Sequence, residues 1–467
     1  MKATLPSVKK IIEKGESERV EFKEKFDKES IETSVAFSNS KGGIILVGVS
    51  DTGEIKGASV GKETLKVWIN KISQSTEPTL IVDAEVYEIE NKNVVAIIVK
   101  ESPIKPISYK GISYLRIKNS NRKLTPKEVA ELYLQTIGSS WDSYSARDAK
   151  IEDIDFEKVK EYIKFANETG RRRIKEKPSE VLKKLELIKD NKPTWAAVLL
   201  FGKEPQRFVL QAKCHCGKFK FSKVEILDDR MIEGNLIEQV DEVMDFIKKY
   251  ISVRFVITGK PRREEIWEYP LEAIREGVIN AIIHRDYTES SEIQVEVYED
   301  RIEIWNPGKL PLGITIDDLY KEDHRSIPRN KLIAQIFYDI GFIEKYGSGT
   351  IRMLELCKKA GIFLEFKEVS NGFSAIFRKD IYTEEYLRNL GLNERQINAV
   401  MFVKKEGRIT NRKYQDLFKV SRQTASRELS QLAQKGIFKQ VGVTGKGTYY
   451  TLVQTPHKRL TNASKGS

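Results

Sequence analysis

Cysteine, histidine and long apolar runs are scarce in this sequence. Its 467 residues include three Cys and four His, too few for a disulfide framework, which indicates a reducing compartment. The longest apolar runs, such as 44–49 and 196–201, fall far short of the roughly 18 residues that a membrane span needs. The N-terminus lacks the charged, apolar and small-residue sections of a signal peptide. The sequence therefore predicts a cytoplasmic protein that does not enter the membrane.

A P-loop is also absent. No G-x-x-x-x-G-K-[ST] pattern occurs in the chain, and its absence disfavours a motor of the P-loop class. Any nucleotide site must therefore be built from other residues.

Acidic residues are under-represented in one part of the chain only. The whole sequence has a net charge of +12, and residues 392–467 hold 15 Lys and Arg against 4 Asp and Glu, a balance of +11. A basic segment of this kind is typical of a module that binds a polyanion. The length suggests about three or four domains, and the motifs place them at 1–135, 136–260, 261–380 and 381–467.

The remaining motifs are arranged around the stretch 271–287, LEAIREGVINAIIHRDY. Its apolar residues recur every three or four positions and Pro270 precedes it, so the sequence predicts a helix. Glu276, Asn280 and His284 stand four residues apart and project from one face of that helix. An amide oxygen is a suitable ligand for Mg²⁺, and a carboxylate can orient a water toward a phosphate.

Two later motifs accompany this helix. Residues 302–311, IEIWNPGKLP, indicate an alternating strand that ends in an Asn-Pro-Gly turn. Residues 346–361 begin with Tyr-Gly-Ser-Gly and continue as a helix. In such a loop the backbone N–H groups can hold phosphate.

In this order the three motifs resemble the GHKL or Bergerat adenine-nucleotide fold of gyrase, Hsp90 chaperones, histidine kinases and mismatch-repair ATPases. The resemblance implies ATP and Mg²⁺ as cofactors, with Glu276 as the water-polarising base and Asn280 as the metal ligand. It implies a nucleotide site that includes Asn280, Asn306, Gly308, Gly347 and Gly349. We expect three more residues to contribute: His284 on the same helix face, Ser348 in the glycine loop, and Arg329 as part of a lid over the phosphates. Asn306 and Leu310 stand where the family usually has Asp and Gly. The alternatives are a solvated polar helix face beside an ordinary turn and, for Arg329, a surface ion pair.

Residues 1–135 predict an α+β unit with a helix over 30–39, strands within 42–50 and 93–100, and a hairpin at Gly111. Its motifs resemble the Schlafen-type AlbA-like nucleic-acid-binding domain: Glu16, Glu21-Phe22-Lys23, Ala36-Phe37-Ser38-Asn39, Gly42-Gly43, Gly48-Val49 and Asp51-x-Gly53. Basic residues near the hairpin are expected to contact RNA or single-stranded DNA. They are Lys110, Arg116, Lys118, Arg122 and Lys123.

An alternative role for this unit rests on Glu16, Glu21 and Asp51. They resemble the carboxylate trio of those Schlafen relatives that cut RNA. Three converging carboxylates can hold a divalent metal for phosphodiester cleavage. The competing interpretation is that the two glutamates are surface charges and the aspartate caps a turn. The unit would then dock nucleic acid or protein without cutting it.

Residues 136–260 predict a middle α+β domain that resembles the middle region of bacterial and archaeal Schlafen-AlbA regulators. The run 193–202, PTWAAVLLFG, indicates a buried strand, and residues 234–251 indicate an amphipathic helix.

The C-terminal residues 381–467 predict helices over 393–405 and 410–418, a third helix from Ser421, and two strands around a Gly-Lys-Gly tip. This order resembles the winged helix-turn-helix of bacterial and archaeal regulators. The expected contacts to double-stranded DNA lie at the second helix, the front of the third helix and the wing. They are Arg412, Lys413, Ser421, Arg422, Gln423, Thr424, Ser426, Arg427 and Lys446. The alternative is a protein-binding winged helix.

Taken together, these features predict an α+β multidomain protein with an AlbA-like Schlafen domain, a middle α+β region, a GHKL-like α/β sandwich and a C-terminal winged helix-turn-helix. The predicted function is a DNA-binding transcriptional regulator, as a homodimer, whose ATP- and Mg²⁺-binding module modulates DNA binding. The residues leave open whether ATP is hydrolysed or only bound. Two alternatives also stay open: a metal-dependent nuclease, and a DNA binder without enzymatic activity whose nucleotide site is vestigial.

Overall fold

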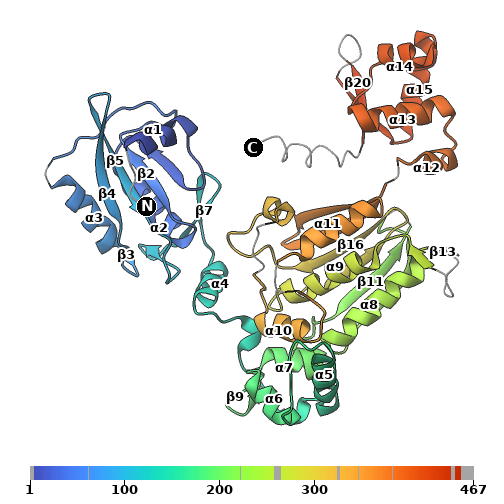
Figure 1. The fold of residues 1–467 in the computed structure, drawn as a ribbon, viewed down its shortest axis with the longest axis horizontal. Coiled ribbons are helices and arrows are strands. Elements are labelled where there is room, and N and C mark those ends of the chain that lie inside the picture. The colour runs from blue at the N-terminus through green and yellow to red at the C-terminus, as the bar shows by residue number, and fades with distance from the viewer. Residues whose placement is uncertain are drawn as a thin grey trace.

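A computed structural model describes residues 5–61, 63–220, 222–256, 264–322, 327–344, 347–380, 382–442 and 448–453. Figure 1 shows three units along the chain, and their mixed α+β, multidomain architecture confirms the predicted fold class at this level. Of the helices in the described part of the chain, none combines the length and the apolar character needed to span a bilayer.

The N-terminal unit is built on a four-stranded sheet in the order β1-β2-β5-β4. Its helix α2 buries nine of twelve residues, and the Asn39 side chain holds the hairpin segment by bonding Ile107 and the Tyr114 carbonyl. The helices and strands are α1 (Leu5–Lys14), β1 (Val20–Lys23), α2 (Lys28–Asn39), β2 (Gly43–Val47), α3 (Thr64–Ser75), β3 (Thr76–Glu77), β4 (Asp83–Ile89), β5 (Lys92–Val99), β6 (Ser108–Tyr109), β7 (Tyr114–Ile117), β8 (Ser120–Lys123) and α4 (Pro126–Thr136).

The central unit contains a six-stranded sheet in the order β12-β11-β15-β16-β18-β17, in which only the β11–β15 pair is parallel among the pairs described. Helices α8, α9 and α11 lie across one face of this sheet (Figure 1). The elements are β11 (Cys214–Phe219), β12 (Ile226–Ile232), α8 (Leu236–Tyr250), α9 (Leu271–His284), β15 (Ile293–Val297), β16 (Arg301–Pro307), α11 (Gly349–Lys359), β17 (Ile362–Val369) and β18 (Gly372–Lys379). Strands from both sides of residue 260 thus share one sheet and one hydrophobic core.

A smaller helical layer completes this unit. One of its helices corrects a prediction from the sequence. The run Trp195–Phe201, predicted as a strand, forms helix α7, which begins where Thr194 Oγ1 accepts a hydrogen bond from the Ala197 N–H. All seven residues except Trp195 are buried, so the run shows no period that separates helix from strand. The other elements are α5 (Phe156–Glu168), α6 (Pro178–Lys184), β9 (Ile188–Lys189), β10 (Lys192–Pro193), β13 (Val253–Val256), β14 (Glu264–Trp267), α10 (Lys331–Asp339) and the 3₁₀ turns η1 (Trp141–Ser143), η2 (Ile151–Asp153), η3 (Pro205–Arg207) and η4 (Ile316–Tyr320).

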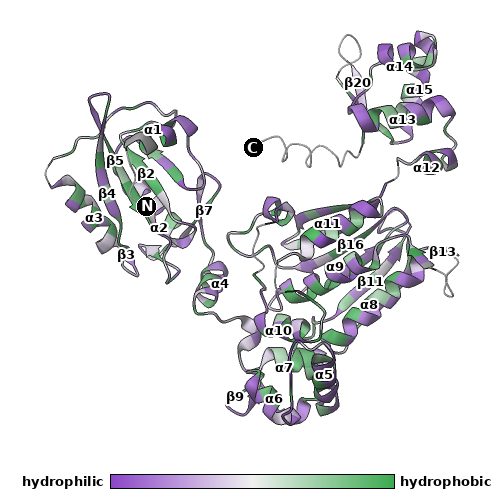
Figure 2. Ribbon diagram, in the orientation of Figure 1, coloured by the Kyte–Doolittle hydropathy of each residue, from purple (hydrophilic) through white to green (hydrophobic). Residues whose placement is uncertain are grey.

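The C-terminal unit has its own core, and its helices begin at capping side chains. Asn393, Thr410 and Ser421 each accept a hydrogen bond from the third N–H of the helix that follows. Most residues of α14 are coloured as hydrophilic in Figure 2. The elements are α12 (Glu384–Asn389), α13 (Glu394–Glu406), α14 (Asn411–Phe418), α15 (Arg422–Gln434), β19 (Phe438–Val441) and β20 (Tyr449–Leu452).

Candidate functional site

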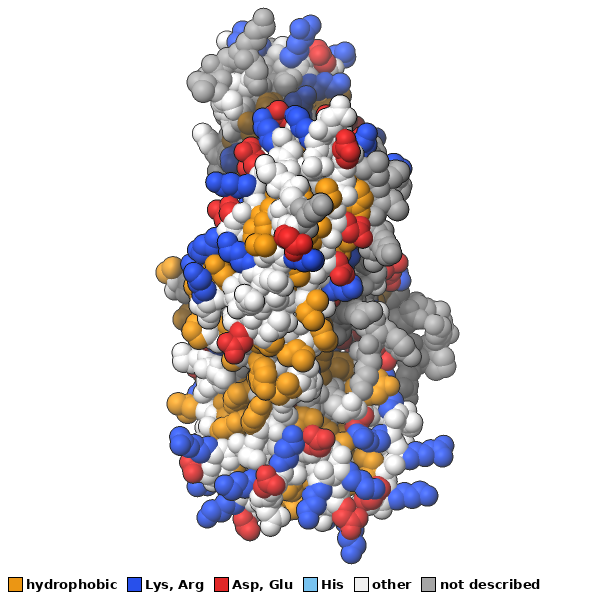
Figure 3. Space-filling view, turned by 90° about the vertical axis from the view of Figure 1, so that its left-hand side faces the viewer, with side chains coloured by type: hydrophobic (Ala, Val, Ile, Leu, Met, Phe, Trp, Pro, Cys, Tyr) orange, Lys and Arg blue, Asp and Glu red, His pale blue; other side chains and the backbone are white. Residues whose placement is uncertain are grey.

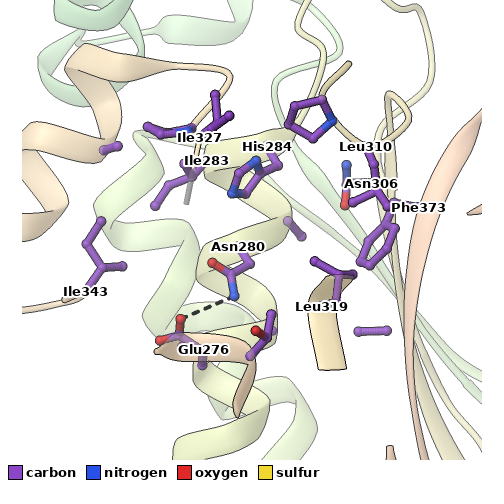
Figure 4. Close-up of a pocket in the computed structure, with 18 of the residues that line it drawn as sticks. Glu276, Asn280, Ile283, His284, Asn306, Leu310, Leu319, Ile327, Ile343 and Phe373 are labelled. Carbon is purple, nitrogen blue, oxygen red and sulfur yellow. Dashed lines mark hydrogen bonds between the residues drawn. The ribbon is translucent and has the colours of Figure 1, made fainter. Parts of the chain in front are cut away.

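Helix α9 presents two different faces. On one face, Gly277 packs so closely on the sheet that a Cβ atom there would lie 3.2 Å from the side chains of Ile304 and Phe377. The adjacent face carries Glu276, Asn280 and His284, whose side chains point toward a cavity that Gly277 also lines (Figure 4). The helical period therefore fixes one face on the sheet and leaves the polar face for a ligand.

The cavity has a volume of about 390 Å³ and is lined by elements from across the central unit. Seven of the residues predicted for the nucleotide site line it: Glu276, Asn280, His284, Asn306, Gly308, Gly347 and Gly349. Figure 4 shows Asn306, Leu310 and Phe373 on the side opposite α9. Residues up to 99 positions apart in sequence, from Glu276 to Ala375, are thus gathered around one hollow.

The end of the cavity near the glycine loop brings Glu276 and the first residue of α11 together. A Cβ atom at Gly349 would lie 2.2 Å from Glu276 Oε1, so only glycine fits there with the carboxylate in this position. Asn280 Nδ2 donates a hydrogen bond to the same Oε1 at 3.2 Å, which leaves the amide oxygen for another partner. Burial raises the pKa of the Glu276 carboxyl above its usual range.

The opposite end of the cavity is mostly apolar. Leu310, Phe366 and Phe373 line it, and Asn306, which is only 3% exposed, supplies an amide. Asn306 Nδ2 donates to the Pro307 carbonyl at 3.2 Å. An apolar region with one buried amide has the character of a site for an aromatic ring that also carries hydrogen-bonding groups.

His284 lies between the two ends and is neutral at physiological pH. Burial, and to a smaller degree the positive charge of Arg329, lowers the pKa of its imidazole to about 4. A neutral imidazole has one nitrogen that donates and one that accepts a hydrogen bond. His284 can therefore contact a polar ligand without adding charge to the site.

Two predicted site residues occupy other positions. Ser348 precedes α11 without lining the cavity, and its side chain makes no capping hydrogen bond. Arg329, predicted to contact the nucleotide, lies beside a second cavity and is bound by protein groups: it donates to the carbonyls of His284 and Lys309 and pairs with Glu131. The sequence did not reveal these contacts, because the partners of Arg329 come from segments that are distant in sequence.

The cavity also contains polar residues that the sequence motifs did not indicate. Lys309, Lys331, Gln335 and Thr350 line it. Lys309 follows the Asn-Pro-Gly turn and Thr350 follows the glycine loop, so proximity to these motifs was a usable signal for both. Lys331 and Gln335 belong to α10, and no feature of their sequence indicates the cavity. The two lysines supply positive charge suited to a phosphate group.

The N-terminal unit places the five predicted nucleic-acid contacts in two environments. Lys110, Lys118, Arg122 and Lys123 are exposed, although Arg122 also pairs with Glu128. Arg116 is 2% exposed and pairs with the buried Glu21 at 2.7 Å, so it is a structural residue and not a surface contact, which corrects the prediction. On the face shown in Figure 3, basic and acidic side chains are interspersed.

The predicted carboxylate trio of this unit is engaged in other interactions. Glu21 pairs with Arg116 and with Lys23, and Glu16 Oε1 accepts a hydrogen bond from the Phe22 N–H at 3.0 Å. Asp51 is exposed. Within the described ranges, no three His, Cys, Asp or Glu side chains gather as metal ligands. The geometry therefore gives the nuclease alternative no support.

The C-terminal unit exposes most of the predicted DNA contacts. Arg412, Lys413, Ser421, Arg422, Gln423, Ser426 and Arg427 are exposed, whereas Thr424 is half-buried in the first turn of α15. Ser421 Oγ accepts a hydrogen bond from the Thr424 N–H and so begins the helix. Lys446 lies outside the described residues. Arginine and glutamine at the start of an exposed helix are suited to reading base edges in a major groove.

Comparisons with known proteins support two of these units. Residues 16–125 match the family described as "Schlafen, AlbA_2", and residues 290–377 match the family described as "Putative ATP-dependent DNA helicase recG C-terminal". The second match includes Asn306, Gly308, Gly347 and Gly349 but begins after α9.

No curated protein matches the chain. The crystal structure of the DIP2311 protein from Corynebacterium diphtheriae is 18% identical, with 93% of this chain and 95% of that chain covered and a TM-score of 0.41. The chain is thus similar to the Schlafen AlbA_2 family in its N-terminal unit and to the recG C-terminal family in its central unit.

Proposed function

We propose that this protein is a DNA-binding transcriptional regulator with an ATP- and Mg²⁺-binding module of the GHKL type in its central unit. The observation that carries the proposal is the convergence of Glu276, Asn280, Asn306 and the two loop glycines on one cavity. The similarity of residues 290–377 to a family described as ATP-dependent supports it. The domain limits at residues 135 and 380 are part of the proposal, whereas the expected limit at residue 260 is dropped because strands before and after it share one sheet and one core.

The donor set of the cavity fits a magnesium nucleotide. The Glu276 hydrogen bond orients Asn280 so that its oxygen, the atom type that Mg²⁺ prefers, is available for a ligand. Bound Mg²⁺ would neutralise phosphate charge. The N-terminal turn of α11 places backbone N–H groups beside the cavity, and Lys309 and Lys331 add positive charge.

Glu276 is the residue best placed to accept a proton from water in this cavity. Burial raises the pKa of its carboxyl, which makes the ionised form a stronger base than a surface glutamate. The adenine ring binds at the apolar end of the cavity, beside Leu310, Phe373 and the Asn306 amide. The neutral His284 contacts the part of the nucleotide between the two ends.

The nucleic-acid-binding role rests on the two outer units. We assign the C-terminal unit as a winged helix-turn-helix that binds double-stranded DNA through Arg422, Gln423 and Arg427 at the front of α15. The similarity of residues 16–125 to the AlbA_2 family supports contact of the N-terminal unit with RNA or single-stranded DNA. A homodimer would present two C-terminal units to a palindromic site.

The proposal is tested by separating binding from hydrolysis. Glu276→Gln keeps the size of the side chain and a hydrogen-bond acceptor but removes the base, so it should bind ATP·Mg²⁺ and fail to hydrolyse it. Asn280→Ala should lose binding. If hydrolysis by the wild type is also zero while binding persists, the module only binds ATP. If neither variant differs from an active wild type, the cavity is not the site.

A further inference from the structure

Arg329 connects three segments although it lies outside the nucleotide cavity. Its Nε donates to the His284 carbonyl at 3.1 Å, Nη2 donates to the Lys309 carbonyl at 2.7 Å, and Nη1 binds Glu131. The side chain is 15% exposed, so most of its contacts are with protein rather than water. An arginine with a planar fork of donors can hold several acceptors in fixed relative positions.

Two of these acceptors belong to the wall of the cavity. The His284 carbonyl is at the last residue of α9, and Lys309 follows the turn that begins at Asn306. The Asp286 N–H also donates to the Pro307 carbonyl at 2.9 Å. Gly308 has a positive φ of 101°, and a Cβ atom there would lie 2.9 Å from Asp286 Cβ. The end of α9 and the turn are therefore held together by direct contacts.

The third acceptor belongs to α4, the helix that leads out of the N-terminal unit (Figure 1). Glu131 of α4 pairs with Arg329, and Lys127, one turn earlier, pairs with Asp286 at 2.6 Å and with Glu289. A second cavity of about 210 Å³ lies along this contact and shares Ile327 and Lys331 with the nucleotide cavity. The contact is thus made of partly buried ion pairs at the edge of the proposed site.

The segment that follows α4 is attached to another wall of the same cavity. The buried Asp142 accepts a hydrogen bond from the Ile333 N–H at 2.9 Å, and Ser140 Oγ accepts one from the Lys331 N–H at 3.2 Å. Both bonds cap the start of α10, whose residues Lys331 and Gln335 line the cavity. The chain between the N-terminal and central units is therefore held by two walls of the nucleotide cavity.

We propose that Arg329 is a positioning residue that couples occupancy of the nucleotide cavity to the placement of α4. A ligand that fixes the end of α9 and the turn 306–309 also fixes the two carbonyls that hold the guanidinium, and the guanidinium in turn fixes Glu131. Nucleotide binding is then communicated to the N-terminal, AlbA-like unit through this ion pair. This inference rests on the proposed nucleotide site. It adds the contacts through which nucleotide binding affects the N-terminal unit.

The test uses the full chain and three variants. Glu131→Gln removes the charge that Arg329 binds on α4 and leaves the two carbonyl bonds in place. Arg329→Ala removes all three bonds. Glu128→Gln is the matched control, because Glu128 is on the same helix but pairs with Arg122 inside the N-terminal unit. Calorimetry with a non-hydrolysable ATP analogue and Mg²⁺ is combined with hydrogen exchange of the α4 amides in the same samples.

In the wild type and in Glu128→Gln, the nucleotide should slow exchange of the α4 amides. Glu131→Gln should lose this slowing and, because the coupling is reciprocal, should bind the nucleotide a few-fold more weakly than the wild type. Arg329→Ala should lose the slowing and bind roughly tenfold more weakly. Binding heat without any change at α4 in the wild type, or a full response in Glu131→Gln, would overturn the coupling alone. No binding heat in the wild type would overturn the proposed nucleotide site and the coupling together.

Discussion

Glu276 Oε1 occupies the place where a side chain on residue 349 would begin, since a Cβ atom at Gly349 would lie only 2.2 Å from it. The carboxylate of α9 and the first residue of α11 are therefore in contact although 73 positions separate them. This contact joins two motifs that the sequence shows only as separate patterns.

Gly349→Ala should test the importance of this contact. The atom in the way is the end of a flexible side chain, so the fold should lose little stability, within about 1 kcal/mol. The carboxylate must move, however, and ATP binding or hydrolysis should fall clearly. Calorimetry and thermal unfolding measure the two effects. Gly61→Ala is the control, because a Cβ there would meet only Thr64 Oγ1 at 3.6 Å. Unchanged nucleotide binding in Gly349→Ala would show that the position of Glu276 is unimportant.

Arg116→Ala should destabilise the N-terminal unit. The substitution leaves the buried Glu21 with only Lys23 as an ion-pair partner, and removal of one member of a buried pair costs about 3–5 kcal/mol. Urea unfolding of the full chain, followed by hydrogen exchange of α2, measures the change. Lys123→Ala removes an exposed charge of the same sign and should change stability by less than about 0.5 kcal/mol. Equal stability of the two variants would contradict a structural role for Arg116.

Arg427→Ala should weaken binding to a cognate DNA site by about 1–3 kcal/mol if the guanidinium donates hydrogen bonds to a guanine. Lys435→Ala is the comparison, since this residue caps the C-terminal end of α15, roughly 12 Å from Arg427 along the helix axis. Fluorescence anisotropy at fixed salt measures both affinities. Equal losses for the two variants would indicate a general charge effect rather than a specific contact.

The stability of the C-terminal unit should decline at acid pH. Glu428 is 2% exposed, and the hydrogen bond from Arg395, helped by one from Tyr414, lowers the pKa of its carboxyl. The folded pKa is thus below the unfolded value of about 4.3. The stabilisation is present above that value and is lost as the pH falls through the folded pKa.

Hydrogen exchange of the α15 amides across this pH range, corrected for intrinsic rates, measures the decline. Glu428→Gln should lower protection at neutral pH and flatten the dependence. If protection of the α15 amides in Glu428→Gln falls with decreasing pH as steeply as in the wild type, the decline is caused by other carboxylates.

The sequence predicted those parts of the site that lie in local patterns. The four-residue spacing of Glu276, Asn280 and His284 was sufficient to place them on one helix face, and the capping pattern at Ser421 marked the start of a helix in the C-terminal unit. These features depend on neighbours within one or two helical turns.

The parts that were missed depend on distant partners. Arg329 is an apparent surface arginine until Glu131, His284 and Lys309 are brought beside it by the fold. Arg116 lies among exposed basic residues in the sequence, but β7 turns it toward Glu21. The apolar run of α7 has no period because nearly every residue in it is buried, and the cap at Thr194 was its only local signal for a helix.

The most direct test of the central claim is titration of the full chain with a non-hydrolysable ATP analogue by isothermal calorimetry, with and without Mg²⁺. The wild type should bind one nucleotide per chain in a Mg²⁺-dependent manner, and Asn280→Ala should lose that binding while keeping its thermal unfolding temperature. Absence of binding heat in the wild type, or equal binding by a folded Asn280→Ala variant, would contradict a magnesium-nucleotide site on helix α9.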